Sequence, residues 1–239
     1  KAAATLKVTA PSYTAAGDEA KLTVQLVDID GKPVASDVAA TEVKAYATSK
    51  PDDSVFSSGS TDTIDFVKNG KATIDVVGNK VGVYKVQVAI TAGSKVYVGT
   101  CDVCFGSETV SGNDIIFIIG ASSYVVDGKP VAATSVPFIE NGRTFLGIRD
   151  MGLAMGIIGD ENIVWDKATQ TAKLVKDGIT VEVTVGATAI KVTKNSVTTE
   201  VAIDAPAQNK DGRVFLPFRA VFQAFGYAVE YANGVITCI

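Results

Sequence analysis

An eight-residue motif occurs twice in this chain, and it constrains the fold more than any other feature. Residues 142–149 read Gly-Arg-Thr-Phe-Leu-Gly-Ile-Arg, and residues 212–219 read Gly-Arg-Val-Phe-Leu-Pro-Phe-Arg, at an offset of 70. A glycine follows each copy at the same offset. This agreement predicts an internal repeat, and therefore a duplicated structural unit. The recurring positions are Gly142, Arg143, Phe145, Leu146, Arg149 and Gly156 in the first copy, and Gly212, Arg213, Phe215, Leu216, Arg219 and Gly226 in the second.

Composition excludes several classes of function. The 239 residues are 47% hydrophobic, which is enough for the cores of two domains. No run of about 18 apolar residues occurs, so we expect no membrane span. The net charge of -4 and the lack of a basic cluster argue against a nucleic-acid partner. The chain has no histidine, the usual group for acid–base chemistry and for zinc or copper sites, so we expect no enzyme and no cofactor.

The first part of the chain, residues 1–108, shows the pattern of a β-sandwich. Apolar and polar residues alternate over residues 20–27 and 83–90, as in half-buried strands. About seven such runs are separated by turn residues. The turn Asp30-Gly31 follows Asp28, a spacing that invites comparison with a calcium loop, but Lys32 breaks the ligand pattern and favours a plain turn.

Residues 20–92 resemble a bacterial immunoglobulin-like domain of the surface-protein kind. The resemblance lies in residues 22–24 (Leu-Thr-Val), 30–34 (Asp-Gly-Lys-Pro-Val), 69–73 (Asn-Gly-Lys-Ala-Thr) and 81–86 (Val-Gly-Val-Tyr-Lys-Val). It implies a module that spaces or presents other parts of a protein without chemistry of its own.

The second part, residues 109–239, begins within a polar, turn-rich linker at residues 106–113. Each copy of the motif leads into a short helical segment, residues 149–155 and 219–225, that ends at a glycine suited to close a helix. Strand patterns surround both segments. We therefore predict two internal repeats, about 114–186 and 187–239, each combining strands with one short helix. The whole chain is predicted to be mainly β, with a sandwich followed by a β-rich α+β domain.

Residues 114–239 resemble the copper amine oxidase N-terminal-like domain, or stalk domain, of secreted proteins from Gram-positive bacteria. The resemblance includes Pro137, residues 141–146 (Asn-Gly-Arg-Thr-Phe-Leu), Val164-Trp165-Asp166 and the second copy of the motif. The second copy has Tyr231-Ala232 in place of Trp-Asp, and the first has Gly147 where the second has Pro217. The resemblance implies a non-catalytic domain. The copper site of these oxidases uses three histidines and a tyrosine-derived quinone, and this sequence has no histidine.

The repeated arginines and two aromatic residues have two interpretations. Arg143, Arg149, Arg213 and Arg219 could bind anions or polysaccharide, but their regular placement favours arginines that pack over aromatic rings and fix turns. Trp165 and Tyr231 could stack on sugars, but we expect them to be buried in the repeat. Phe145 and Phe215 are predicted core residues.

Three cysteines leave several pairings open. Cys101 and Cys104 form a CxxC motif, but thioredoxin-like chemistry needs this motif at the N-terminus of a helix. Here the motif lies at the end of a run of strand residues, where alternation points the two thiols to opposite faces. Cys238 lies next to the chain end, where we expect a sheet edge. An odd cysteine suggests a disulfide or an intersubunit cross-link, and the alternative is three buried thiols.

These features predict a secreted, extracellular, non-enzymatic structural protein of the bacterial cell surface. The first residue is Lys1, as expected after removal of a signal peptide or in a fragment. The partners we expect are copies of the chain itself, which would pair through open sheet edges into a filament, fibre or surface array. The alternative is an adhesin that binds cell-wall polysaccharide.

Overall fold

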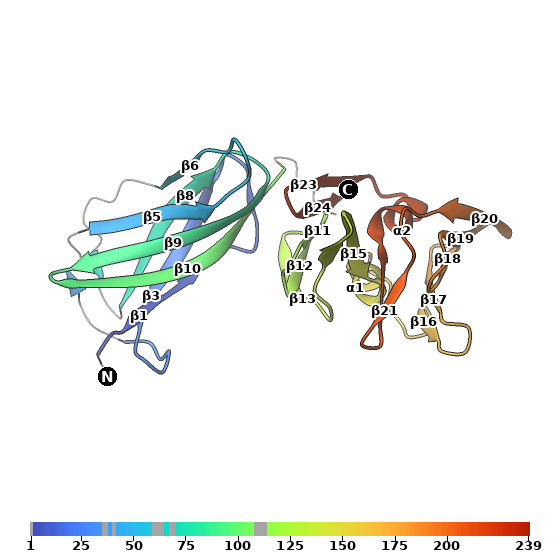
Figure 1. Ribbon diagram of the computed structural model, residues 1–239, viewed down its shortest axis with the longest axis horizontal. Coiled ribbons are helices and arrows are strands. Elements are labelled where there is room, and N and C mark those ends of the chain that lie inside the picture. The colour runs from blue at the N-terminus through green and yellow to red at the C-terminus, as the bar shows by residue number, and fades with distance from the viewer. Residues whose placement is uncertain (1, 35–37, 40–41, 59–64, 67–69, 108–113) are drawn as a thin grey trace. The chain divides into compact units, whose positions relative to one another are not determined.

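The computed structural model describes residues 2–34, 38–39, 42–58, 65–66, 70–107 and 114–239 (Figure 1). Strands dominate these residues and two short helices occur among them, which confirms the predicted mainly-β fold. The chain divides into two compact units, which are residues 1–109 with 232–235, and residues 110–231 with 236–239. The domain boundary predicted at 108/109 lies outside the described residues.

The described residues of unit 1 form two four-stranded sheets and a separate strand pair. The first sheet has the order β1 (Thr5–Thr9), β3 (Glu19–Val27), β8 (Lys71–Gly78), β6 (Phe56–Ser58). The second has the order β2 (Thr14–Ala15), β10 (Lys95–Gly106), β9 (Gly82–Ala92), β5 (Glu42–Ser49). The strands β4 (Val38–Ala39) and β7 (Asp65–Phe66) pair with each other.

The core of unit 1 forms because every second residue of the long strands is apolar. Leu22 and Val24 of β3 are fully buried, and Tyr84 and Phe105 meet edge to face with ring centroids 5.1 Å apart. The strand orders correspond to A-B-E-D and A′-G-F-C of an immunoglobulin topology. Membership of the bacterial immunoglobulin-like family stays a prediction.

The segment after β3 is a tight turn. The Oδ1 atom of Asp28 accepts hydrogen bonds from the backbone N–H groups of Asp30 and Lys32, both at 2.9 Å. The Asp28 side chain therefore stabilises this turn, which agrees with the plain turn that the sequence pattern favours.

Unit 2 contains three sheets and both helices. One five-stranded sheet has the order β13 (Lys129–Ala132), β12 (Ser123–Val126), β11 (Ile115–Ile118), β24 (Val235–Cys238), β23 (Val229–Ala232). The other has the order β16 (Ile163–Asp166), β17 (Thr171–Lys176), β18 (Ile179–Thr184), β19 (Ala189–Lys194), β20 (Val197–Ala202). The central sheet has the order β14 (Phe138–Glu140), β15 (Arg143–Gly147), β22 (Arg213–Pro217), β21 (Gln208–Lys210). The helices are α1 (Ile148–Ala154) and α2 (Phe218–Ala224).

The two copies of the repeated motif pair with each other at the centre of unit 2. Strands β15 and β22 run antiparallel, with Leu146 opposite Leu216, Phe145 opposite Pro217 and Gly147 opposite Phe215. Equivalent residues of the two copies differ by 70 in residue number. Exchanging the copies therefore turns the pair Phe145–Pro217 into the pair Phe215–Gly147, which is also present. The repeat therefore creates a local pseudo-two-fold relationship centred on the two leucines.

Each repeat also completes a sheet that the other begins. By their place in the sheets, β13, β12 and β11 correspond to β20, β19 and β18, while β24 and β23 correspond to β17 and β16. The structural repeats therefore meet at the turn Asp177-Gly178, between β17 and β18, and not after residue 186 as predicted. Because β17 and β18 form one continuous hairpin, the sequence alone did not mark this boundary.

Both helices end in the same hydrogen-bonded motif. Gly156 and Gly226 have φ of 75° and 94°, values that favour glycine. The next residues, Ile157 and Tyr227, donate to the carbonyls of Gly152 and Phe222 at 2.9 and 3.1 Å. This is the Schellman arrangement, so each exit glycine stops its helix after two turns.

Candidate functional site

The repeated motif builds turns and core with most of its residues. Asn141 and Gly142 have φ of 51° and 72°, and Asp211 and Gly212 have φ of 52° and 76°, as expected for two-residue hairpin turns. Phe145, Leu146, Phe215 and Leu216 are buried. The arginines of the motif point to the surface, so they are the candidates for binding.

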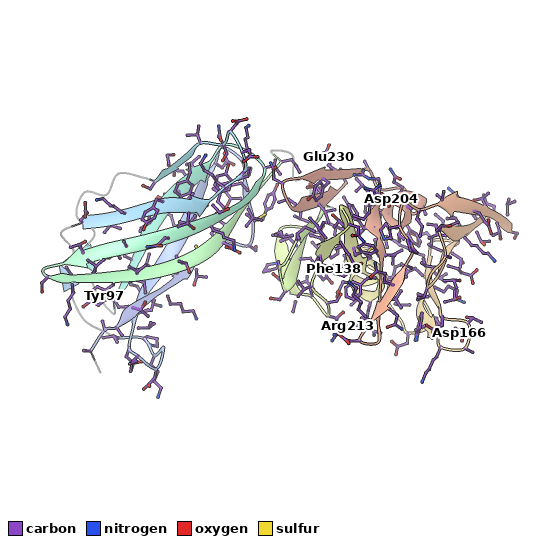
Figure 2. All side chains as sticks on the ribbon, viewed as in Figure 1. Tyr97, Phe138, Asp166, Asp204, Arg213 and Glu230 are labelled. Carbon is purple, nitrogen blue, oxygen red and sulfur yellow. The ribbon has the colours of Figure 1, made fainter. Side chains whose placement is uncertain are left out.

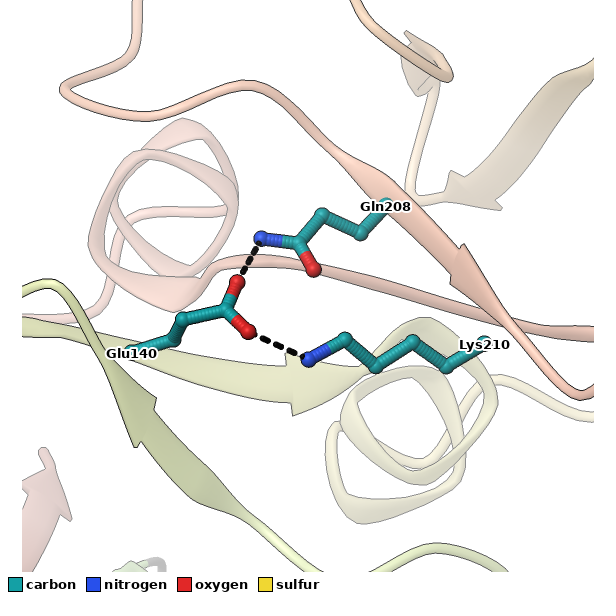
Figure 3. Close-up of polar contacts among 3 residues, drawn as sticks. All are labelled: Glu140, Gln208 and Lys210. Atoms are coloured by element: carbon teal, nitrogen blue, oxygen red, sulfur yellow. Dashed lines mark hydrogen bonds and ion pairs between the residues drawn. The ribbon is translucent and has the colours of Figure 1, made fainter.

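Polar side chains from the two edge strands of the central sheet meet in one cluster. The Oε1 atom of Glu140 lies 2.8 Å from Nζ of Lys210, its equivalent in the second repeat, and Oε2 accepts from Nε2 of Gln208 at 2.7 Å (Figure 3). Hydrogen bonds from Lys210 and then Gln208 lower the pKa of Glu140. Lys210 also lies 4.0 Å from the ring centroid of Phe138. The cluster joins the two repeats and has no free charge, so it is structural.

Two surface pockets are related by the pseudo-two-fold. The first, named the Trp165 pocket, includes Trp165, Arg149 and Arg213 in its wall. The second, named the Tyr231 pocket, includes Tyr231, Arg219 and Arg143, which are the equivalent residues. Each pocket thus combines the last arginine of one motif copy, the first arginine of the other copy, and one aromatic residue. The sequence does not reveal this grouping, because it depends on how β15 pairs with β22.

The expected burial of Trp165 and Tyr231 is wrong. Their side chains are 36% and 43% exposed. The physical reason is their position on β16 and β23, the end strands of the two five-stranded sheets. A residue on an end strand has a neighbouring strand on one side only, so part of each ring stays accessible.

The arginines of the Tyr231 pocket are occupied by protein groups. Nε of Arg143 lies 2.8 Å from Oδ2 of Asp204. Arg219 donates a hydrogen bond of 2.6 Å to the carbonyl of Val229 and lies 5.8 Å from the ring centroid of Phe218. These contacts resemble the bracing role that the sequence favours for the arginines.

The Trp165 pocket keeps more of its positive charge available. Arg149 lies 3.5 Å from Asp160, whose side chain is 97% exposed. In the part of the chain that the structure describes, no ion pair or hydrogen bond is found for the side chain of Arg213. Figure 2 shows Arg213 in the lower part of unit 2 and Asp204 in the upper part, so the acid that neutralises Arg143 lies away from Arg213.

The position equivalent to Asp204 is Thr134, and its segment is fixed by a buried acid. Asp150 of α1 is 2% exposed and accepts four hydrogen bonds, from the backbone N–H and the hydroxyl of both Thr134 and Ser135. Their lengths run from 2.5 to 2.9 Å. Asp150 therefore shapes the wall of the Trp165 pocket, a role that the sequence did not indicate.

The structure favours one of the alternatives left open for the cysteines, that of free thiols. Cys101, Cys104 and Cys238 are all free thiols, and Cys104 and Cys238 are buried. Cys238 lies in β24, which has β11 on one side and β23 on the other, so it does not lie at a sheet edge. No disulfide joins the three cysteines in the structure, and an intersubunit bridge through Cys238 would require this buried residue to become accessible. Cys104 and Cys238 pack as small apolar groups, and Cys101 is half-buried.

We expect these thiols to react slowly. Burial raises the pKa of Cys104 and Cys238 to about 12, and burial with the charge of Asp102 raises that of Cys101 to about 11. At pH 8 about one thiol in a thousand or fewer is then ionised, so a disulfide reagent should label the folded chain at least about a hundredfold more slowly than the chain in denaturant. Rapid labelling of any thiol in the folded chain would contradict this burial.

No group of three or more metal-binding side chains that could hold an ion is found in the described ranges. Among the same residues, no helix is long and apolar enough to cross a membrane.

The fold and the two pockets define unit 2 as a duplicated β-rich domain with paired surface sites. Residues 125–239 match the family model of the copper amine oxidase N-terminal domain. This match confirms the resemblance to that domain which the repeated motif indicates for the C-terminal part of the chain.

Other comparisons show distant similarity. No curated protein matches the chain. Solved structures of surface layer protein SbsC are similar: its domains 1–6 at 18% identity and TM-score 0.31, covering 86% of this chain and 26% of that one. Its domains 4–9 are similar at 17% identity and TM-score 0.31, covering 87% of this chain and 32% of that one. The chain thus spans about a quarter to a third of the length of these structures. Similarity at this level does not define a function.

Proposed function

We propose that the chain is a secreted, non-enzymatic structural component of a Gram-positive bacterial cell surface, and that it assembles with copies of itself. The observation that carries the proposal is the open edge strand β20. The assignment to the cell surface is supported by the stalk-domain family and by the resemblance of unit 1 to surface-protein modules. The lack of histidine in the sequence supports a role without catalysis.

Strand β20 has the properties of a strand that accepts a partner. All six of its residues are exposed, and it lies at the end of its sheet. Ile203 donates to the carbonyl of Thr188, so by the antiparallel alternation the backbone groups of Thr198, Glu200 and Ala202 point away from β19. Such a row of unpaired N–H and C=O groups is a template for another strand.

The equivalent edge in the first repeat is closed. Strand β13 has four residues, and Pro130 occupies the position that corresponds to Glu200. Proline has no N–H to offer, and its backbone position also points away from the neighbouring strand, because Ala133 donates to the carbonyl of Ser122. One of two equivalent edges is therefore blocked by proline, and the other is available.

The partner we propose for β20 is β20 of a second copy. Antiparallel pairing about a two-fold axis satisfies both strands with one kind of surface. A register that sets Glu200 opposite Thr198 of the second copy keeps the two glutamates apart and pairs their outward backbone groups. This contact gives a dimer, and growth into a filament or array needs a second contact through another surface.

The test is a single substitution, Glu200→Pro, which copies the natural Pro130. It removes an outward N–H and an exposed carboxylate but no hydrogen bond between β19 and β20, so unit 2 should fold with its thermal transition unchanged. Self-association, measured by sedimentation velocity over a concentration series and by negative-stain microscopy, should be lost.

Two controls make the outcome specific. Glu200→Gln keeps the N–H and should associate as the parent does. Thr199→Pro removes an inward N–H bonded within the sheet and should lower the stability of unit 2 instead. If the parent chain stays monomeric at every concentration, the proposed self-assembly is wrong. If Glu200→Pro associates as strongly as the parent, the contact does not use β20.

A further inference from the structure

We propose that the Trp165 pocket binds an acidic saccharide, meaning a sugar unit that carries a carboxylate or a phosphate. This inference is independent of the proposed self-assembly, because β20 does not contribute to the pocket. It rests on the combination of an accessible indole, two arginines and hydroxyl groups in one small concavity.

The pocket offers separate surfaces for the two parts of such a ligand. The accessible part of the Trp165 ring is an apolar plate for the C–H face of a sugar. Arg149 and Arg213 supply planar guanidinium groups, which bind carboxylate and phosphate through paired hydrogen bonds. The two arginines come from different copies of the motif, so the folded repeat is required to bring both to one ligand.

Charge distinguishes this pocket from its pseudo-equivalent. In the Tyr231 pocket, Asp204 already holds Arg143 at 2.8 Å. In the Trp165 pocket the corresponding residue is Thr134, and the described residues give Arg213 no acidic partner. Among the described residues, Arg149 contacts one acid, the solvent-exposed Asp160 at 3.5 Å, which an incoming anion can displace at little cost. An anion is therefore the ligand class that the first pocket favours over the second.

Hydroxyl chemistry and size favour a sugar as the carrier of the anion. The hydroxyls of Thr134 and Ser135 donate to Asp150, so their oxygens keep lone pairs that can accept from sugar hydroxyls. The buried Asp150 holds both groups in place before any ligand arrives. The pocket volume of about 230 Å³ is below the range of pockets that enclose drug-sized molecules, and it suits one ring with its acid group.

The chain provides its own probe for a test. Trp165 is the only tryptophan in the sequence, so tryptophan fluorescence reports on the surroundings of this side chain, and the substitutions below assign the response to the pocket. We expect saturable changes in emission with trigalacturonate or with galactose 6-phosphate at constant ionic strength, with affinities of about 1 mM or better. Galactotriose and galactose, the matched neutral sugars, should give none. Binding of one acidic probe alone identifies carboxylate or phosphate as the group recognised.

Substitutions assign the binding to the pocket. Arg213→Gln removes an exposed cation and should weaken binding about tenfold or more, with unchanged thermal unfolding. Arg143→Gln, the equivalent change in the Tyr231 pocket, should leave binding unchanged. Asp204→Asn frees Arg143 and should raise the calorimetric stoichiometry from one site to two, while the fluorescence response stays that of the parent.

Three results would overturn the inference. They are no saturable response to either acidic probe, equal binding of the neutral sugars, or an affinity that Arg213→Gln and Arg143→Gln change to the same extent. Because the Glu200→Pro chain keeps this pocket, its fluorescence titration separates failure of saccharide binding from failure of self-assembly.

Discussion

Replacing Leu146 with alanine should destabilise unit 2 by about 3–5 kcal/mol. Leu146 and Leu216 are both 0% exposed and lie opposite each other where β15 meets β22. The truncation opens a cavity at the centre of the pseudo-two-fold, and both repeats pack around that point. The measurement is urea unfolding followed by Trp165 fluorescence, which reports on unit 2.

Two variants calibrate this result. Leu153→Ala changes the same residue type on α1, where the side chain is exposed, and should cost less than about 1 kcal/mol. The double variant Leu146→Ala with Leu216→Ala should cost less than the sum of the single changes, because the two cavities merge. A loss below about 1 kcal/mol for Leu146→Ala would mean that the seam between the motif copies is not a core.

Replacing Asp150 with alanine should cost about 2–4 kcal/mol of the stability of unit 2. The change leaves the backbone N–H groups and hydroxyls of Thr134 and Ser135 without their acceptor. Asp150→Asn should be destabilising as well, because an amide NH₂ then faces groups that donate hydrogen bonds. Thermal unfolding and urea unfolding of unit 2 both measure the effect.

A matched exposed acid provides the control for Asp150. Asp204→Asn removes an acid that also pairs across the pseudo-two-fold but is solvent-exposed, and it should change stability by less than about 1 kcal/mol. If Asp150→Ala changed the stability of unit 2 as little as Asp204→Asn does, the four hydrogen bonds would not be the interactions that fix residues 134–135. Because that segment lines the Trp165 pocket, Asp150→Ala should also weaken acidic-sugar binding more than Asp204→Asn does.

Much of the local structure could be predicted because its causes are local. Asn141-Gly142 and Asp211-Gly212 form hairpin turns at positive φ, and Gly156 and Gly226 end the helices. Each of these features depends on the conformational freedom of one or two residues, so a sequence pattern is enough to predict it.

The candidate site could be predicted only in part. The sequence singled out the arginines and the two aromatic residues, but it assigned Trp165 and Tyr231 to the core and Cys238 to an edge. Strand alternation tells which residues share a face, but it does not tell which strand ends a sheet. That information comes from pairing between distant segments, such as β24 between β11 and β23.

The amino-acid sequence alone was enough to predict a β-rich chain whose C-terminal part is duplicated and resembles the copper amine oxidase N-terminal domain, and residues 125–239 match the model of that family. How the two copies lie in the fold became clear only from the tertiary structure. Pairing of β15 with β22 set Arg213 beside Arg149 and Trp165, and set Arg143 beside Arg219 and Tyr231. The same sequence motif thereby produced one pocket whose charge is neutralised and one whose charge is available. The difference arises because electrostatics depends on distance through space, and residues such as Arg143 and Asp204 come within 2.8 Å only when the repeats fold against each other.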